Sequence, residues 1–242
     1  MKKITLFLLT AIIVFGCTKS SVRPTGTVAL NMTASTPTNK PTIGGRVQSS
    51  AVVISEFQLS LKGIKFEFDE NDDHFKKDSS YNDDIKLKGP FIVNLLNAGA
   101  FVKQQLTKAD LPNATYKEVQ FKLYPSQDQS SKLFGKSILI VGTINGKPFT
   151  FSNNIEEDFH VDYEVLSKRL SVNSNNAAIK IDISLDRLFN PLNGGQDLGS
   201  AKDGNGDGKI EIGPTDNDGN HDLSDVIRKL LKKIINIKDD QN

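Results

Sequence analysis

The chain has one cysteine, no tryptophan and almost no net charge. Cys17 is the only cysteine among 242 residues, so no disulfide can form within the chain. Its 30 Lys and Arg residues nearly balance 29 Asp and Glu residues, which gives a formal net charge of +1. Because binding to nucleic acid depends on an excess of positive charge, we expect no nucleic-acid partner.

The common signatures of catalysis are also missing. The sequence holds no Gly-x-Ser-x-Gly motif and no Gly-x-x-x-x-Gly-Lys-Ser/Thr phosphate loop. None of its three histidines forms a pair with zinc-ligand spacing. Hydrophobic residues make up 37% and charged residues 24%, which is enough to form a core. The composition therefore predicts a folded domain, and we expect that it is not an enzyme.

The beginning of the chain resembles the signal sequence of bacterial lipoproteins. Lys2 and Lys3 precede an apolar run over residues 4–14, which is short for a membrane span. The next residues complete Val14-Phe15-Gly16-Cys17, which is similar to a lipobox. The resemblance implies cleavage after residue 16, acylation of Cys17 and a tether over 17–26. The alternative is an ordinary cleaved signal peptide with a chance cysteine.

A lipid on Cys17 would place the protein in the bacterial cell envelope. Each buried methylene of an acyl chain contributes about 0.8 kcal/mol, so several chains anchor a domain firmly. No later apolar run approaches membrane-spanning length. The residues after the cysteine, Thr18-Lys19-Ser20, lack the acidic run that resembles a surface-export signal. We therefore expect attachment to the outer membrane, on its periplasmic side.

The strongest strand signal lies in residues 51–68. Phe57, Leu59 and Leu61 alternate with polar residues, and a second alternation begins at Ile64. The phase changes by one residue at Gly63. Such a change predicts a β-bulge, because one extra residue restores the inward face of the strand.

Further strand-like segments follow at short spacing along the chain. They cover residues 27–32, 85–87, 91–96, 116–123, 137–144, 148–151, 156–166, 169–172 and 178–185. Asn145-Gly146 between two of them predicts a tight hairpin. The composition indicates loops over residues 33–46 and over the acidic residues 69–84. It indicates a helical turn over residues 97–106. The series predicts an all-β fold, an antiparallel β-sandwich over residues 27–189.

The end of the sandwich is followed by a loop and one helix. Residues 190–222 are rich in Asp, Asn and Gly. Apolar residues then recur at helical spacing, which predicts an amphipathic helix over 223–238 with Asp222 as its N-cap. We expect the apolar stripe to dock on the sandwich, the alternative being a helix that lies on a membrane surface.

Several segments in this order resemble the bacterial lipoprotein family called domain of unknown function 4382. They are Gly26-Thr27-Val28-Ala29-Leu30, residues 57–66 (FQLSLKGIKF), 91–96 (FIVNLL), 111–116 (LPNATY) and 141–149 (VGTINGKPF). The resemblance covers residues 26–189. It implies an immunoglobulin-like or transthyretin-like sandwich on a lipid anchor, and it supplies no activity and no catalytic residues.

One loop has the pattern of a calcium site. The loop resembles the first part of an EF-hand loop, in which oxygen-bearing side chains alternate along the chain up to a glycine. The backbone carbonyl of the residue after that glycine can supply a further ligand. The expected ligands are Asp203, Asn205, Asp207, the carbonyl of Lys209, Glu211, Asp216 and Asp218. Pro214 stands where the closing glutamate of such a loop belongs. The alternative is a series of Asp/Asn/Gly turns that binds no ion.

A second candidate is a polar strip on the predicted strand 156–166. Its alternate residues, which point to one face of a strand, are Glu156, Asp158, His160, Asp162 and Glu164. Carboxylates around an imidazole could hold a cation or a sugar, or serve a hydrolase. The alternative is the solvated face of a half-buried strand.

Taken together, these patterns predict a membrane-anchored lipoprotein whose sandwich is a binding or structural module, with calcium as a hypothetical stabiliser. Its expected partners are the membrane, through the lipid on Cys17, and an envelope protein or glycan of unknown identity. The alternatives are a carbohydrate-handling accessory protein and a hydrolase that uses the polar strip.

Overall fold

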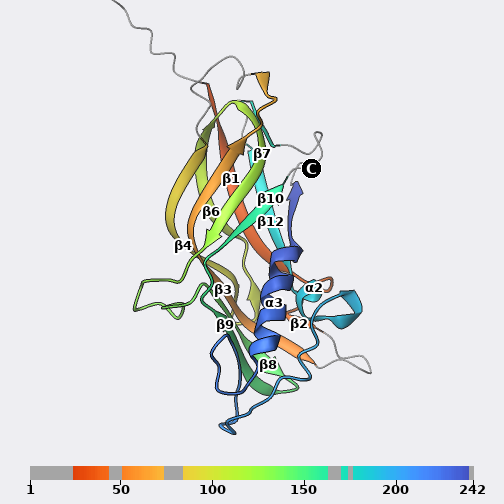
Figure 1. Cartoon of the computed structure of the whole chain (residues 1–242). Coiled ribbons are helices and arrows are strands. Elements are labelled where there is room, and N and C mark those ends of the chain that lie inside the picture. Colours follow the sequence, from red (N-terminus) through yellow and green to blue (C-terminus); the bar gives the residue numbers. More distant parts are fainter. Residues whose placement is uncertain (1–23, 44–50, 74–83, 163–169, 174–176, 240–242) are drawn as a thin grey trace, which may run out of the picture.

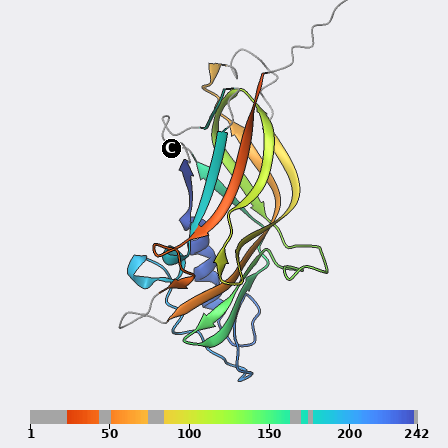
Figure 2. The same ribbon diagram turned by 180° about the vertical axis from the view of Figure 1, so that it is seen from behind.

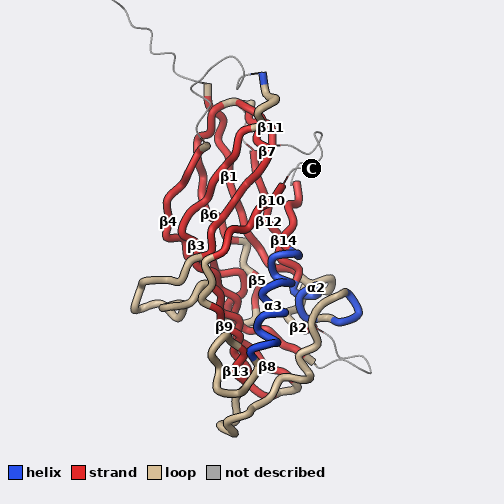
Figure 3. The backbone as a smooth tube through the Cα atoms, viewed as in Figure 1, coloured by secondary structure: helices blue, strands red, loops and turns tan. Residues whose placement is uncertain are grey.

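The structure is a computed structural model that describes residues 24–43, 51–73, 84–162, 170–173 and 177–239. Cys17, the predicted signal peptide, most of the tether and Glu164 lie outside the described residues. Figures 1 and 2 show an elongated molecule built on two β-sheets, with β1, β4, β6, β7 and β12 in one half. The strands β8 and β9 and the helix α3 lie in the other half, so the fold is the predicted all-β sandwich with a C-terminal helix (Figure 3).

The smaller sheet has the strand order β14–β12–β1–β6. Its strands are β1 (Thr25–Ser35), β6 (Gln104–Pro112), β12 (Ala177–Ser184) and β14 (Ile235–Asp239). In the larger sheet the order β10–β7–β3–β8–β9–β13 forms the main path. These strands are β3 (Val52–Phe68), β7 (Ala114–Leu123), β8 (Ile138–Ile144), β9 (Lys147–Asn153), β10 (Glu157–Asp162) and β13 (Ile210–Ile212).

Four more strands join the larger sheet beside this path. They are β2 (Thr42–Ile43), β4 (Ile85–Asn97), β5 (Ala100–Phe101) and β11 (Leu170–Val172). The helical elements are α2 (Leu185–Phe189), the 3-10 turn η3 (Pro191–Asn193) and α3 (His221–Ile234). None of the helices in the described ranges has both the length and the apolar content needed to cross a membrane.

Pairing within the sheets is antiparallel, as expected, except at two places. β1 pairs with β12 in parallel, and β9 pairs with β13 in parallel. Alternation along a strand shows which face is buried but not the direction of its neighbour, so the sequence could not reveal these two pairs. In Figure 2, β1 and β12 run side by side although the whole larger sheet up to β10 separates them in sequence.

The strand β3 crosses both halves of the molecule and contains two bulges. The register against β7 shifts between Leu61 and Gly63, which confirms the predicted bulge and leaves Lys62 as the extra residue. A second shift, between Ile54 and Glu56 against β8, makes Ser55 the extra residue. The sequence analysis missed this second bulge because the three residues of the strand before it, Val52, Val53 and Ile54, are all apolar and show no alternation.

The bulges keep one face of β3 pointing inward along its whole length. The buried apolar residues fall into three alternating groups, 52 and 54, then 57, 59 and 61, then 64, 66 and 68. Opposite the second bulge stands Gly142, where an added Cβ would lie only 2.0 Å from the carbonyl oxygen of Val53. A side chain at Gly142 would therefore clash with the backbone of β3.

The tight turn at Asn145-Gly146 is confirmed. The φ angles of Asn145 and Gly146 are 52° and 83°, and β8 and β9 pair directly on either side of them. Both central residues thus have the positive φ that two-residue hairpins of this kind require.

Two expectations for residues 85–106 are wrong. The segments 85–87 and 91–96 are not separate strands, because β4 runs through both of them across a cis Gly89–Pro90 bond. The expected helical turn over 97–106 is a reversal at Ala98, with φ of 48°, followed by β5 and the beginning of β6. Strand pairing outweighs the weak helical preference of this segment.

The side chain of Gln104 joins the two sheets where β4 approaches β6. Its Oε1 accepts a hydrogen bond from the backbone N–H of Asn94 at 2.6 Å, and its Nε2 donates to the carbonyl of Ile92 at 2.8 Å. The amide thus occupies the position of a neighbouring backbone and satisfies part of the β4 edge.

The C-terminal helix begins and ends earlier than predicted. Its N-cap is Asn220 rather than Asp222, and α3 ends at Ile234. Residues 235–239 form β14, which pairs with β12 and completes the smaller sheet. The β-branched Ile235 and Ile237 suit a strand, and the edge of β12 gives them a partner that the sequence pattern could not show.

The apolar stripe of α3 docks on the sandwich, as expected. Ile227, Leu231 and Ile234 are buried, and the helix contacts β9, β12 and β13. Glu157 of β10 accepts hydrogen bonds from Arg228 at 3.2 Å and from Lys232 at 2.5 Å. Burial would raise the pKa of Glu157, but Lys232 and Arg228 outweigh it and hold this pKa below its usual value.

Loss of apolar contact under α3 should destabilise the whole sandwich. We expect Leu231→Ala to lower the free energy of unfolding by about 2–5 kcal/mol, as truncation of a fully buried leucine does. The measurement is urea unfolding followed by circular dichroism. The control is Val226→Ala on the same helix, where the side chain is 39% exposed and the loss should be small. Equal losses for both variants would mean that the helix is not docked through this stripe.

Candidate functional site

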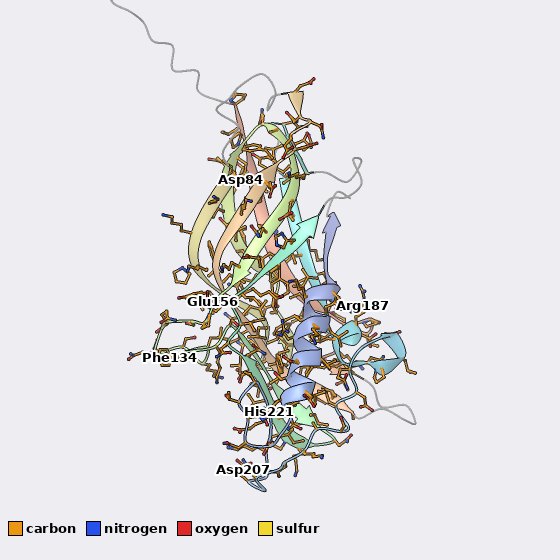
Figure 4. The ribbon with its side chains drawn as sticks, viewed as in Figure 1. Asp84, Phe134, Glu156, Arg187, Asp207 and His221 are labelled. Atoms are coloured by element: carbon orange, nitrogen blue, oxygen red, sulfur yellow. The ribbon has the colours of Figure 1, made fainter. Side chains whose placement is uncertain are left out.

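The predicted polar strip lies on the outer face of the larger sheet. Asp158 and His160 point outward from β10, whereas Phe159 and Val161 between them are buried. Glu156 is exposed and precedes the first residue of β10 (Figure 4). The strip therefore has the inside-outside alternation predicted for it. Asp162 pairs with Glu118 through the backbone, and its side chain lies outside the described part, as does all of Glu164.

The imidazole of His160 is held by β7 rather than by the strip. Its Nδ1 lies 2.6 Å from Oε1 of Glu118, and its Nε2 lies 3.3 Å from Nε2 of Gln120. Both partners stand opposite or beside it on the neighbouring strand. The carboxylate that contacts this imidazole is therefore Glu118, which sequence reasoning did not include.

The same face carries a group of lysines that the sequence analysis did not single out. Cross-strand register places Lys88, Gly63, Lys122 and Asp158 in one row over β4, β3, β7 and β10. The next row on the same face, two residues along each strand, contains Lys86, Lys65, Gln120 and His160. Because residues in one row are direct neighbours across the strands, the two rows bring together ammonium groups from three strands.

The lysines surround a hollow of about 260 Å³, which we call the lysine hollow. It is lined by Lys62, Gly63, Ile64, Lys65, Lys86, Leu87, Lys88, Gln120, Lys122 and Asp158. At Gly63 the outward row has no side chain, and an added Cβ would lie 3.0 Å from the carbonyl oxygen of Leu87. The bulge at Lys62 and the missing side chain at Gly63 together open the hollow.

The exposed surface of the lysine hollow is mostly apolar, although five of its lining residues are lysines. Asp158 is the one carboxylate among its lining residues. Lys65 pairs with Glu67 and Asp84 at 3.0 Å each. Burial lowers the pKa of Lys65, but its hydrogen bonds to these two carboxylates outweigh burial and leave this pKa raised. Figure 4 shows Asp84 above the level of Glu156, toward the end of the sheet where β4 begins.

The other lysines of the hollow do not share this neutralisation. Lys62 Nζ lies 4.3 Å from the centroid of the Tyr124 ring, a cation–π contact. For Lys86, Lys88 and Lys122 the described ranges contain no ion pair. Alternating lysines on two strands are visible in the sequence, but their meeting depends on the register between β3, β4 and β7.

The predicted calcium loop forms a series of tight turns at one end of the molecule, where Figure 4 labels Asp207. Asn205 Oδ1 accepts a hydrogen bond from the N–H of Asp207, and Asp207 Oδ1 accepts one from the N–H of Lys209, both at 2.9 Å. Asp203 Oδ2 accepts one from Gly208 at 3.1 Å. Gly206 and Gly208 have positive φ angles of 75° and 89°, which the turns require.

Two of the expected calcium ligands have other partners. Asp218 Oδ1 accepts the N–H of Asn205 at 3.1 Å, and its Oδ2 accepts that of Glu211 at 2.6 Å. Asp216 accepts the N–H groups of Gly213, Asp218 and Asn220 at 2.9–3.1 Å. These two carboxylates therefore fasten the loop to β13 and to the beginning of α3, a role that the sequence pattern did not predict.

The loop fits a cation in part. Asp203 Oδ2 bonds Lys147 Nζ at 2.8 Å, but its Oδ1 is buried with no hydrogen-bond partner. A calcium ion would satisfy such an oxygen. However, no group of three or more Asp, Glu, His or Cys residues that could hold a metal exists within the described part of the chain.

No family model, curated protein or solved structure matches the chain. The resemblance of segments in residues 26–189 to domain of unknown function 4382 therefore stays a prediction.

Protonation of Asp216 should loosen the junction between the loop and α3. Burial would raise the pKa of Asp216, but the backbone N–H groups and His221, whose Nδ1 lies 3.2 Å away, hold this pKa below its usual value. A carboxyl whose pKa is depressed by folding contributes stability above its unfolded pKa, and this contribution is lost as the pH falls toward the folded pKa. The stability that Asp216 contributes is thus present at pH 7 and lost below about pH 4.

The test is Asp216→Asn. The amide replaces one of the two carboxylate oxygens by an N–H₂ group, which cannot accept hydrogen bonds from the backbone N–H groups. We expect the free energy of unfolding at pH 7 to fall by about 1–3 kcal/mol. We also expect the variant to lose less stability than the parent between pH 5 and pH 3, as measured by urea unfolding at each pH. The matched control is Asp222→Asn, at an exposed position in the first turn of α3. A parallel pH dependence in parent and Asp216→Asn would contradict the assigned role.

Proposed function

We propose that this protein is a lipid-anchored lipoprotein of the bacterial cell envelope and that its sandwich is a non-enzymatic binding module. The observation that carries the proposal is the order of a basic start, a short apolar run and Val14-Phe15-Gly16-Cys17. The lipid on Cys17 attaches the chain to the outer membrane, on the periplasmic side.

The position of the first strand supports a closely held domain. β1 begins at Thr25, so only seven residues separate it from Cys17. A chain extends by at most 3.3–3.6 Å per residue, which limits the distance between acylated cysteine and domain to roughly 25–30 Å. The sandwich would therefore act near the membrane surface, on molecules of the envelope.

The character of the outer sheet face supports binding rather than catalysis. The lysine hollow presents several cations and one carboxylate, and His160 is engaged by Glu118 and Gln120. The near-neutral net charge argues against nucleic acid as the partner. The proposed partner is thus an envelope protein or glycan that meets this face.

Calcium is a proposed stabiliser of the loop between the sandwich and α3. The buried, unpartnered Oδ1 of Asp203 supports this proposal, together with the turn series through Asn205 and Asp207. Asp203, Asn205, Asp207 and the carbonyl of Lys209 would hold the ion, and Glu211 would have to complete its coordination. The ion would be structural, because its ligand Asp203 also accepts a hydrogen bond from Lys147 of β9 and so joins the loop to that strand.

The anchor is tested by Cys17→Ser in cells. We expect the variant to leave the outer-membrane fraction and to appear in the soluble envelope fraction, because a serine does not receive the thioether-linked lipid. Immunoblots of separated fractions measure this. Ser20→Ala is the control for a change near the processing site, and it should stay with the membrane. If the Cys17→Ser protein is as firmly bound as the parent, the proposed anchor is wrong.

Calcium is tested by thermal melting of the purified chain with 2 mM calcium chloride or with excess chelator. A ligand held by the folded state alone raises stability according to its concentration and affinity, so we expect a higher melting temperature with calcium. Asp203→Asn should remove most of the difference, whereas Asp110→Asn, an exposed change on β6, should keep it. Identical melting curves in calcium and chelator would reject a tightly held ion.

A further inference from the structure

We propose that the lysine hollow binds a carboxylate-bearing sugar unit of an acidic polysaccharide. This inference rests on the proposed function, since it states what the anchored module recognises. The hollow combines five lysines from β3, β4 and β7 with the carboxylate of Asp158 and the amide of Gln120. Each of these features restricts the chemistry of the occupant.

The lysines select an anion. The side chains of Lys86, Lys88 and Lys122 line one concave surface, and none of the three has an ion pair in the described residues. Like charges held together repel each other, and a concave surface concentrates their field. An anionic ligand relieves this repulsion, so charge complementarity requires a negatively charged occupant.

Asp158 distinguishes an acidic sugar from a bare anion. Its carboxylate is half-buried at the end of the row that contains Lys122. Next to a phosphate group it would add repulsion, whereas it can accept hydrogen bonds from hydroxyl groups. Gln120 can donate to and accept from hydroxyls as well. A ligand with one negative charge beside several hydroxyls satisfies both parts of the lining, and a sugar acid is such a ligand.

The type of cation agrees with this occupant. No arginine of the described residues lines the hollow, so these residues offer no planar guanidinium for two-point recognition of a phosphate. The lysine side chains supply single ammonium groups and methylene stems, and the stems form an apolar floor for one face of a sugar ring.

The dimensions limit the site to one sugar unit of a longer chain. Lys88 and Lys122 belong to β4 and β7 on either side of β3, so their backbones are separated by two strand spacings, about 9.6 Å. The volume of about 260 Å³ lies just below the usual range for drug-sized ligands. Neighbouring sugars would extend along the row of Lys86, Lys65 and His160.

Single-stranded nucleic acid fits the hollow less well. Such binding depends on aromatic side chains on which bases stack. Within the described part of the chain no aromatic residue lines the hollow, and the nearby Tyr124 ring already contacts Lys62. A membrane of anionic lipid is the remaining polyanion of the envelope, and it is an outcome that the experiment separates.

The experiment measures binding of the full-length lipoprotein in neutral detergent to polygalacturonate, with dextran as the uncharged polysaccharide. We expect salt-dependent binding to polygalacturonate and none to dextran. Replacement of Lys86, Lys88 and Lys122 by Gln should weaken the affinity at least tenfold. The matched control makes the same charge change on other surfaces, at Lys40, Lys108 and Lys229, and should lose less than threefold.

Asp158→Ala, which removes the acceptor that an amide would keep, separates a sugar acid from a simple anion. If Asp158 accepts sugar hydroxyls, the variant should bind polygalacturonate more weakly and inorganic phosphate no more weakly than the parent. Vesicles of phosphatidylglycerol form a third arm. Vesicle binding that is stronger than polygalacturonate binding and is lost in the Lys86, Lys88, Lys122 variant would replace the glycan with a membrane surface and overturn the proposal.

A measurement on the unaltered protein guards against misfolded variants. Acetylation of lysines by acetic anhydride, read by mass spectrometry, should be slowed at Lys86, Lys88 and Lys122 by polygalacturonate and unchanged at Lys108. Uniform rates, or equal losses in both triple variants, would overturn the proposal. These assays do not depend on membrane attachment, so they can fail while the Cys17→Ser result stands, and the reverse.

Discussion

The fold depends on keeping one face of β3 turned inward over its 17 residues. A strand of this length extends roughly 55 Å, and it pairs with β8 in one half of the molecule and with β7 in the other. The extra residues Ser55 and Lys62 each restore the inward orientation of the apolar side chains that follow them. The side chains of β3 therefore contribute to one continuous core. Without either correction, the apolar residues beyond it would point to solvent.

The same device shapes the candidate binding face. The bulge at Lys62 and the lack of a side chain at Gly63 create the lysine hollow, and the register on both sides of β3 brings Lys88 and Lys122 to it. A solution to a packing problem on the inner face thus produces a concave, charged surface on the outer face. The structural and binding features of this protein therefore depend on one short segment of backbone.

The end of the molecule that contains the predicted calcium loop is stabilised by polar contacts rather than by a packed apolar face. Asp216 and Asp218 accept backbone N–H groups from a loop that has few apolar residues, and Asn220 bonds the carbonyls of Lys202 and Glu211. These contacts set where α3 begins, and the pair of Glu157 with Arg228 and Lys232 adds to the apolar docking of the helix. Short-range spacing suggested metal ligands here, because carboxylates that bind calcium and carboxylates that bind backbone have the same spacing in sequence.

The sequence alone determined the features that local pattern controls. Alternation identified β3, its bulge at Gly63 and the inward residues of β7, Asn145-Gly146 identified the hairpin, and helical spacing identified α3. Only the tertiary structure decided the parallel pairs, the change from helix to strand after Ile234, and the meeting of Lys86, Lys88 and Lys122. The physical reason is that a period along the chain fixes which way a side chain points, whereas its neighbours depend on register and edge pairing between segments far apart in sequence.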